Sequence, residues 1–227
     1  ADAAGAVADL VFQSTDYASL PVGAYWLGAV AYTLQIYFDF SGYSDMAIGL
    51  AKLFGIDFPE NFRQPYQAST IQDFWRRWHI TLSTWMSDYV FYPLSFWFRN
   101  YKQIGVILAV LITFFISGMW HGPNWTFIIW GSLHGLAIAY EVATKNIRFA
   151  LAKKTPAKLY RFISIFITLH FMMFTIVLFK SDSLTTALEM YATIFNHFNL
   201  QVAHEWVNVY TLPAAMIALG FILHYTP

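Results

Sequence analysis

Long apolar stretches dominate this sequence and limit what it can fold into. Four of them cover residues 22–38, 104–120, 160–179 and 209–225, and a shorter fifth covers residues 125–140. A helix needs about 20 residues to cross the hydrocarbon layer of a membrane, because each residue advances it by about 1.5 Å. We therefore predict an all-α, polytopic membrane protein in which these stretches form a bundle of transmembrane helices.

The composition excludes several other classes of protein. Hydrophobic residues make up 58% of the 227 residues and charged residues 11%, against about 25% charged in a typical soluble domain. The 13 basic residues balance the 13 acidic ones, so no basic field exists to hold a nucleic acid. The chain has no cysteine, which excludes a disulfide, a thiolate nucleophile and a zinc-thiolate site.

Residues 104–140 form two apolar runs joined by the sequence WHGPN at residues 120–124. The glycine and the proline of this sequence predict a break in the helix. We expect two helices too short to cross the membrane fully, so that the turn between them lies below the membrane surface. Exposed backbone is tolerated there only beside protein or a water-filled cavity.

Residues 39–103 differ in character, because charged residues alternate with aromatic ones and no apolar run reaches spanning length. We interpret this region as short amphipathic helices that lie at the cytoplasmic interface or dip into the bundle. One wide apolar face with His79 near its edge is predicted by the spacing of Phe74, Trp75, Trp78, Leu82 and Trp85.

Charge asymmetry predicts the orientation of the chain in the membrane. Residues 141–161 carry six Lys or Arg residues and one acid, whereas residues 181–208 carry no Lys or Arg. The positive-inside rule therefore places residues 141–161 in the cytoplasm and the His121 turn on the outer side. We expect a multi-pass protein of the bacterial inner membrane. The acidic first 20 residues and the missing initiator Met suggest that this single membrane domain, residues 1–227, is a fragment of a longer chain.

Three of the seven histidines are candidates for chemistry. His121 lies in the broken turn, where an ionisable group is costly and commonly functional, although it could simply cap a helix end. His134 lies between Gly131 and Gly135, a spacing that brings a second helix close, and a hydrogen bond between helices is as good an interpretation as catalysis. We interpret His170 and His224 as packing residues, and His197 and His204 as solvated loop residues.

The third candidate, His79, follows two arginines. Arg76 and Arg77 suit an anion clamp for phosphate groups, but anchoring at the cytoplasmic surface explains them equally well. A metal site of His79, His121 and His134 is conceivable, yet no carboxylate or thiolate lies at ligand spacing on the same turns. We expect no metal and no bound cofactor.

The longest motifs resemble a known family. They are LGAVAYTLQIYFDFSGYSDMAIGL at residues 27–50, PENF at 59–62, FWRRWHITLSTW at 74–85, WHGPNWTF at 120–127 and WGSLHG at 130–135. Together they are similar to the membrane-bound O-acyltransferases, and most similar to the bacterial branch that acetylates alginate and peptidoglycan. The remaining sequence matches the family only in being hydrophobic.

The resemblance implies a helical membrane fold around a tunnel, with the acyl donor entering from the cytoplasm and the acyl group leaving toward the outer side. It assigns the two motif histidines, His121 and His79, as catalytic residues. We also expect the donor or the acceptor to be bound by other polar and aromatic residues of the chain, namely Asp39, Ser41, Arg76, Arg77, Trp78, Trp120, Asn124, Trp125 and His134.

The leading hypothesis is therefore an O-acyltransferase that moves acetyl from a cytoplasmic thioester, expected to be acetyl-coenzyme A, to a hydroxyl of an extracytoplasmic polysaccharide. A periplasmic acetyltransferase could complete the transfer as a partner protein. His121 would act as general base or would carry the acyl group itself. The alternatives are a transporter or channel that uses the same broken helices, and an assembly scaffold without chemistry.

Overall fold

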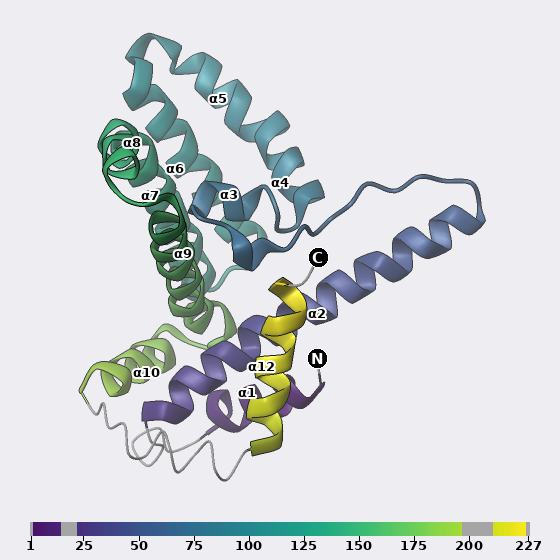
Figure 1. Cartoon of the computed structure of the whole chain (residues 1–227). Helices are drawn as coiled ribbons and strands as arrows, with labels where there is room; N and C mark the ends of the chain where they lie inside the picture. The colour runs from purple at the N-terminus through teal and green to yellow at the C-terminus, as the bar shows by residue number, and fades with distance from the viewer. Residues whose placement is uncertain (1, 15–21, 197–210, 226–227) are drawn as a thin grey trace. The chain divides into compact units, whose positions relative to one another are not determined.

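The computed structural model describes residues 2–14, 22–196 and 211–225, and every regular element in these ranges is helical (Figure 1). The longer helices are α1 (Asp2–Phe12), α2 (Val22–Leu53), α6 (Lys102–Trp120), α7 (Trp125–Ala143), α8 (Lys145–Lys154), α9 (Ala157–Lys180), α10 (Leu184–Asn196) and α12 (Thr211–Tyr225). The shorter ones are η2 (Pro65–Gln67), α3 (Ile71–Trp75), α4 (Ile80–Met86), the π-helix η3 (Ser87–Phe91), α5 (Tyr92–Trp97) and η4 (Arg99–Tyr101).

The chain forms two compact units. The first contains Ala1–Asp45 and Met172–Pro227, and the second contains Met46–Phe171. Helices α2 and α9 each continue from one unit into the other. All three candidate histidines lie in the second unit.

Three helical segments in the described ranges are long and apolar enough to cross a membrane, namely Arg99–Trp120, Trp125–Ala143 and Ala157–Lys180. The prediction that the two helices beside the WHGPN turn are too short was therefore wrong. Helices α6 and α7 have 19 residues each, about 28 Å, which is close to the thickness of the hydrocarbon layer. The helices continue beyond the apolar runs, because α6 begins at Lys102 and α7 ends at Ala143.

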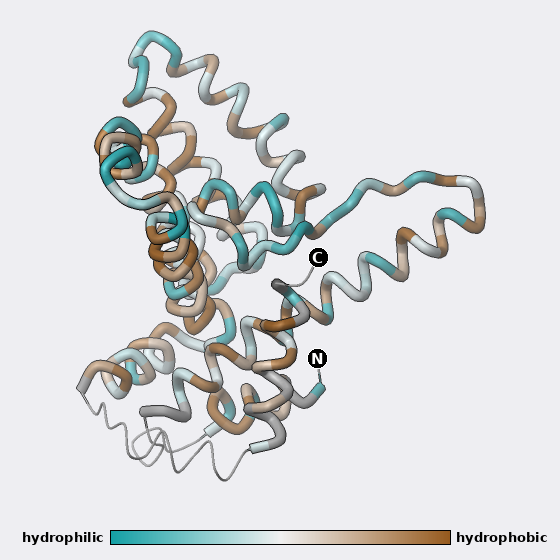
Figure 2. Tube along the Cα trace, in the orientation of Figure 1, coloured by the Kyte–Doolittle hydropathy of each residue, from teal (hydrophilic) through white to brown (hydrophobic). Residues whose placement is uncertain are grey.

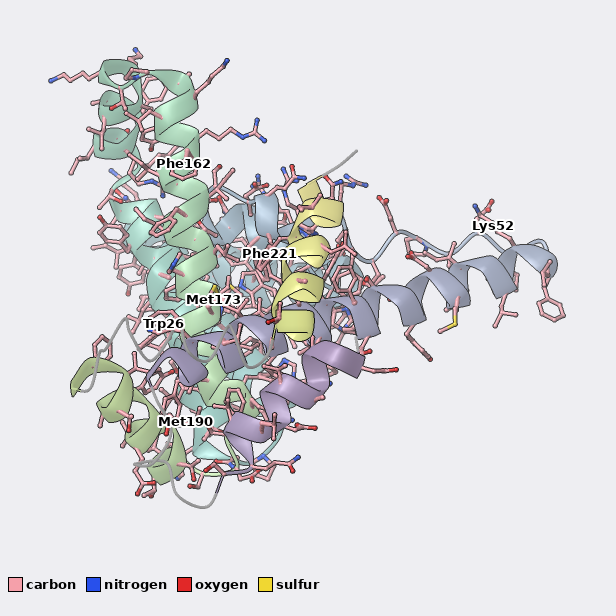
Figure 3. The ribbon with its side chains drawn as sticks, turned by 60° about the horizontal axis from the view of Figure 1, so that its bottom comes forward. Trp26, Lys52, Phe162, Met173, Met190 and Phe221 are labelled. Atoms are coloured by element: carbon pink, nitrogen blue, oxygen red, sulfur yellow. The ribbon has the colours of Figure 1, made fainter. Side chains whose placement is uncertain are left out.

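Helix α2 also continues beyond its apolar run, through Asp39 to Leu53. Two residues after its end lies Gly55, whose φ of 72° falls in the left-handed region that favours glycine. Lys52 lies close to this end (Figure 3), and the segment that follows is mostly hydrophilic (Figure 2). The first part of the predicted interfacial region, residues 39–53, is thus a continuation of a long helix.

Glycines allow α6 and α7 to pack in close contact. A Cβ atom on Gly131 would overlap the carbonyl oxygen of Phe114, and one on Gly118 would overlap the carbonyl oxygen of Phe127. A Cβ atom on Gly135 would lie 3.0 Å from the side chain of Phe114. The close helix approach predicted from Gly131 and Gly135 is confirmed, and the partner helix is α6.

In the first unit, α10 packs against the end of α9. The hydroxyl of Tyr191 donates a hydrogen bond to the carbonyl of Phe174 at 2.7 Å, and Met173 and Met190 are buried (Figure 3). The last predicted apolar stretch is observed as α12 from Thr211 onward. The predictions for His197 and His204 fall outside the described residues.

Candidate active site

His121 lies at the turn between α6 and α7. Its backbone N–H donates to the carbonyl of Gly118, and that of Gly122 donates to Met119, which closes the last turn of α6. Gly122 has a φ of 145°, a conformation that L side chains rarely adopt. Asn124 then caps α7, because its side-chain oxygen accepts the N–H of Thr126 at 3.1 Å. The turn predicted from Gly122 and Pro123 is therefore present. Asn124, which we expected to bind the donor or the acceptor, caps helix α7.

Aromatic rings surround the imidazole of His121. Trp120 and Trp130 contact it edge to face, at 4.9 Å and 5.1 Å between ring centroids, and the tilted ring of Phe127 lies at 6.0 Å. Trp125, which we expected to line the site, is 66% exposed. Burial, and to a smaller extent the charge of His79, lower the pKa of His121 to about 4. His121 is therefore neutral at physiological pH, as a general base must be.

His79 interrupts the apolar face predicted for residues 74–85. It has a φ of 44°, so α3 ends before it and α4 begins after it. The loop that contains Asn61 holds this break open, because the N–H of Ile80 donates to the carbonyl of Asn61 at 2.9 Å. The ring nitrogen Nδ1 of His79 lies 3.2 Å from Oδ1 of Asn61. That oxygen also accepts the hydroxyl and the N–H of Thr81, and the Thr81 hydroxyl lies 3.4 Å from Nδ1 of His79, so Asn61 and Thr81 together position the His79 ring.

The charges of the two motif histidines interact, although 42 positions separate them in the sequence. The charge of His79 contributes to the lowered pKa of His121, and burial lowers the pKa of His79 itself. Helix α3 lies along α7. It begins beside Glu141 near the end of α7, and its last residue, Trp75, lies 5.5 Å from His134 between ring centroids. His79 follows α3 after three residues.

His134 is fully buried, with 0% of its surface exposed. Its Nδ1 lies 2.9 Å from the carbonyl oxygen of Trp130 one turn earlier on α7. Its ring contacts those of Trp75, Phe114, Trp130 and Phe171. Trp130 thus lies against both His121 and His134, and connects the turn to the interior of the unit.

The two arginines have different surroundings. Arg76 is exposed and lines a cavity of about 480 Å³ together with Trp75, Ser83, Asp88, Thr113 and Phe114. Arg77 forms an ion pair with Asp73, with 3.0 Å between Nε and Oδ1, and both side chains are 30% exposed. Trp78 packs against Phe62 and Phe74. The cavity has the size of a small-molecule site, and Arg76, but not Arg77, is among its lining residues.

Three further residues were predicted to bind the donor or the acceptor, namely Trp120, Asp39 and Ser41. Trp120 contacts His121 but is 57% exposed. Asp39 and Ser41 lie on α2 in the first unit, whereas the histidines lie in the second, and their binding roles stay predictions. Within the described ranges no group of three or more His, Asp or Glu side chains could hold a metal ion, so His79, His121 and His134 do not form such a group.

Several residues of the site were missed by sequence reasoning. Trp130 and Asn61 lie inside the motifs quoted above, and their position there was the sequence signal that could have identified them. Glu141 was seen only as the single acid of a basic segment, and its role depends on a contact with residues 70 positions away.

Comparison with known proteins gives a consistent result. The profile of the membrane-bound O-acyltransferase family (MBOAT) matches residues 9–183. A probable alginate O-acetylase AlgI of Azotobacter vinelandii is 44% identical over 200 residues, which cover 86% of this chain and 37% of that protein. A peptidoglycan O-acetyltransferase of Helicobacter pylori is 43% identical over 169 residues, 73% of this chain and 30% of that protein.

A more distant relative is a teichoic acid D-alanyltransferase of Bacillus subtilis, 34% identical over 158 residues, 66% of this chain and 39% of that protein. The chain therefore spans less than half the length of each of these relatives. The helical fold and the three helices long enough to span a membrane define an all-α membrane protein. The chain belongs to the membrane-bound O-acyltransferase family.

Proposed function

We propose that this protein transfers an acetyl group from a thioester donor to a hydroxyl group of a polysaccharide outside the cytoplasm. The observation that carries the proposal is the position of His121 at the turn between α6 and α7, against the rings of Trp120 and Trp130, where burial keeps it neutral. The names of the relatives support the same chemistry, since one is a probable alginate O-acetylase and another a peptidoglycan O-acetyltransferase.

The proposed reaction needs one general base. Neutral His121 accepts the proton of the acceptor hydroxyl, whose oxygen attacks the thioester carbonyl. The tetrahedral intermediate then collapses, the carbon–sulfur bond breaks, and the thiolate receives the proton from the imidazolium of His121. His79 is a second imidazole whose charge acts on His121. In the alternative route, His121 carries the acetyl group before the hydroxyl attacks.

The donor is proposed to be acetyl-coenzyme A from the cytoplasm. Its phosphates need cationic partners, and Arg76 supplies one at the wall of the cavity. The basic segment at residues 141–161 supports a cytoplasmic position for the end of α7 that contacts α3. We propose an inner-membrane location, and a periplasmic acetyltransferase is a candidate partner for the final transfer.

The test is transfer of labelled acetyl from acetyl-coenzyme A in membranes that contain the protein expressed from its complete gene. His121→Ala is expected to lower the rate by about 100-fold or more, with the amount of protein in the membrane unchanged. A transporter or a scaffold would show no His121-dependent transfer. If the variant retains more than about a tenth of the rate, the proposed role of His121 is wrong.

A further inference from the structure

Two complementary polar atoms are buried without a partner in neighbouring side chains. Within the described part of the chain, Nε2 of His134 and Nε1 of Trp75 have no hydrogen-bond partner, and both are closed off from solvent. Their rings are in contact, with 5.5 Å between the centroids and an angle of 80° between the planes. A buried polar atom without a hydrogen bond is destabilising, so two such atoms in neighbouring rings call for an explanation.

The protonation of His134 follows from its other nitrogen. Nδ1 faces the carbonyl oxygen of Trp130 at 2.9 Å, and a carbonyl oxygen can only accept a hydrogen bond. The proton is therefore on Nδ1, and Nε2 is a hydrogen-bond acceptor. Nε1 of Trp75 is only a donor. A hydroxyl group is both donor and acceptor, so one hydroxyl satisfies both atoms, whereas a carbonyl or an ammonium group satisfies only one.

The two phenylalanine neighbours of His134 favour an uncharged group. Phe114 stacks on His134 with an angle of 15° between the planes, and Phe171 contacts it edge to face at 5.2 Å. Neither phenylalanine has a polar side-chain atom. A charged group would lose its hydration here without an ionic partner, which is much more costly than the transfer of a hydroxyl.

The pair adjoins the cavity already described. Trp75 and Phe114 both line that cavity and both contact His134, and Ile138, one turn after His134 on α7, lines it as well. A molecule in the cavity therefore lies against two of the side chains whose rings contact the ring of His134. The volume of about 480 Å³ accommodates much more than one water.

We propose that Nε1 of Trp75 and Nε2 of His134 together bind one hydroxyl group, with the indole N–H donating to the oxygen and the hydroxyl donating to the imidazole. The hydroxyl belongs either to an ordered water or to an alcohol substrate in the cavity. The case of an alcohol substrate rests on the proposed function, whereas the case of an ordered water does not.

Three substitutions separate the two nitrogens of His134 from each other and from Trp75. His134→Gln keeps a polar atom near the position of Nε2, whereas His134→Asn keeps one near Nδ1. Trp75→Phe removes the N–H and retains an aromatic ring. Each variant, expressed from the complete gene, is purified in detergent for thermal unfolding and is assayed in membranes with acetyl-coenzyme A and alginate fragments as the probe acceptor.

If an alcohol substrate supplies the hydroxyl, Trp75→Phe and His134→Asn raise the KM for the alginate fragments about fivefold, as expected for the loss of one hydrogen bond. The KM for acetyl-coenzyme A and the melting temperature without substrate then stay unchanged, and His134→Gln stays close to the native protein. If a water supplies it, the same two variants melt at a lower temperature and both KM values stay unchanged.

The proposal is overturned if Trp75→Phe changes neither the KM for the alginate fragments nor the melting temperature. It is also overturned if His134→Asn behaves like the native protein while His134→Gln does not. That result would mean that His134 acts only through the hydrogen bond from Nδ1 to the carbonyl of Trp130, and that Nε2 binds nothing. Failure of the proposed function is seen separately, as a rate that His121→Ala leaves unchanged. The melting comparison between the two His134 variants is independent of that result.

Discussion

The carboxylate of Glu141 accepts a hydrogen bond from the backbone N–H of Ile71 at 2.7 Å, across 70 positions of sequence. Its second oxygen accepts the N–H of Gln72 at 3.1 Å. The end of α7 thereby supplies the acceptor for the first free N–H groups of α3, a role that a residue of the helix itself usually fills. Because α3 carries Trp75, this contact fixes the register of Trp75 against His134.

Removing this carboxylate is expected to loosen α3. Glu141→Ala leaves two backbone N–H groups without their charged acceptor, and such bonds contribute about 1.5–3 kcal/mol each. We expect the free energy of unfolding of the second unit to fall by about the contribution of one such bond or more, as measured by denaturant titration in detergent. Glu141→Gln is expected to be intermediate. Arg148→Ala is the matched control, since Arg148 lies 3.8 Å from Glu141 at a partly exposed site and should change stability by less than about 1 kcal/mol. Equal effects of Arg148→Ala and Glu141→Ala would argue against the anchoring of α3.

The pH dependence of the reaction should reflect the burial of His121. Its pKa is lowered to about 4, so the neutral form persists well below the usual value near 6.5. We expect the acid limb of the pH–rate profile to lie between pH 4 and 5, measured as initial rates of acetyl transfer. Phe127→Ala removes one of the covering rings and should move this limb toward pH 6.5. An acid limb already near 6.5 in the native protein would contradict the burial of His121.

The same shift has a consequence for stability. Between pH 6.5 and 4 the unfolded chain binds a proton at His121 that the folded chain does not bind. The stabilisation from neutral His121 is therefore complete above pH 6.5 and is lost as the pH falls to about 4. Comparing the melting temperature of the native protein with that of His121→Gln across this range checks the sign.

The arginines should differ in their effect on the donor. Arg76 lines the cavity, whereas Arg77 is paired with Asp73, so Arg76→Ala is expected to raise the KM for acetyl-coenzyme A by about tenfold with a smaller change in kcat. Arg77→Ala should change the KM by less than about threefold. The comparison is made by initial-rate kinetics in membranes with equal amounts of each variant. A reduced amount of both variants in the membrane, with an unchanged KM, would support surface anchoring.

The contact between α6 and α7 should tolerate no added methyl group at Gly131. A Cβ atom there would overlap the carbonyl oxygen of Phe114, so Gly131→Ala is expected to destabilise the unit by about 1–3 kcal/mol. Gly49→Ala on α2 is the control, because no atom lies within 4 Å of its added Cβ, and alanine is favoured over glycine in a helix by up to about 1 kcal/mol. Thermal unfolding of the two variants should therefore shift in opposite directions.

The sequence by itself determined the local features. Three of the five apolar stretches predicted the helices of the described residues that are long enough to span a membrane, Gly122 and Pro123 predicted the turn at His121, and Gly131 with Gly135 predicted a close helix contact. Each of these depends on residues within a few turns of one another, so periodicity and backbone preference are sufficient to read them. The lengths of α2, α6 and α7 were less predictable, because a helix continues past its apolar run wherever no residue ends it.

Only the tertiary structure decided which distant residues meet. The approach of His79 to His121, the bond from Ile71 to Glu141, and the different surroundings of Arg76 and Arg77 all depend on how α3 lies along α7. His79 adopts a left-handed conformation that its own sequence does not favour, because Asn61 and Thr81 hold the break from a separate loop and from the following helix. Such contacts are specified by packing between segments far apart in the chain, and no local pattern contains that information.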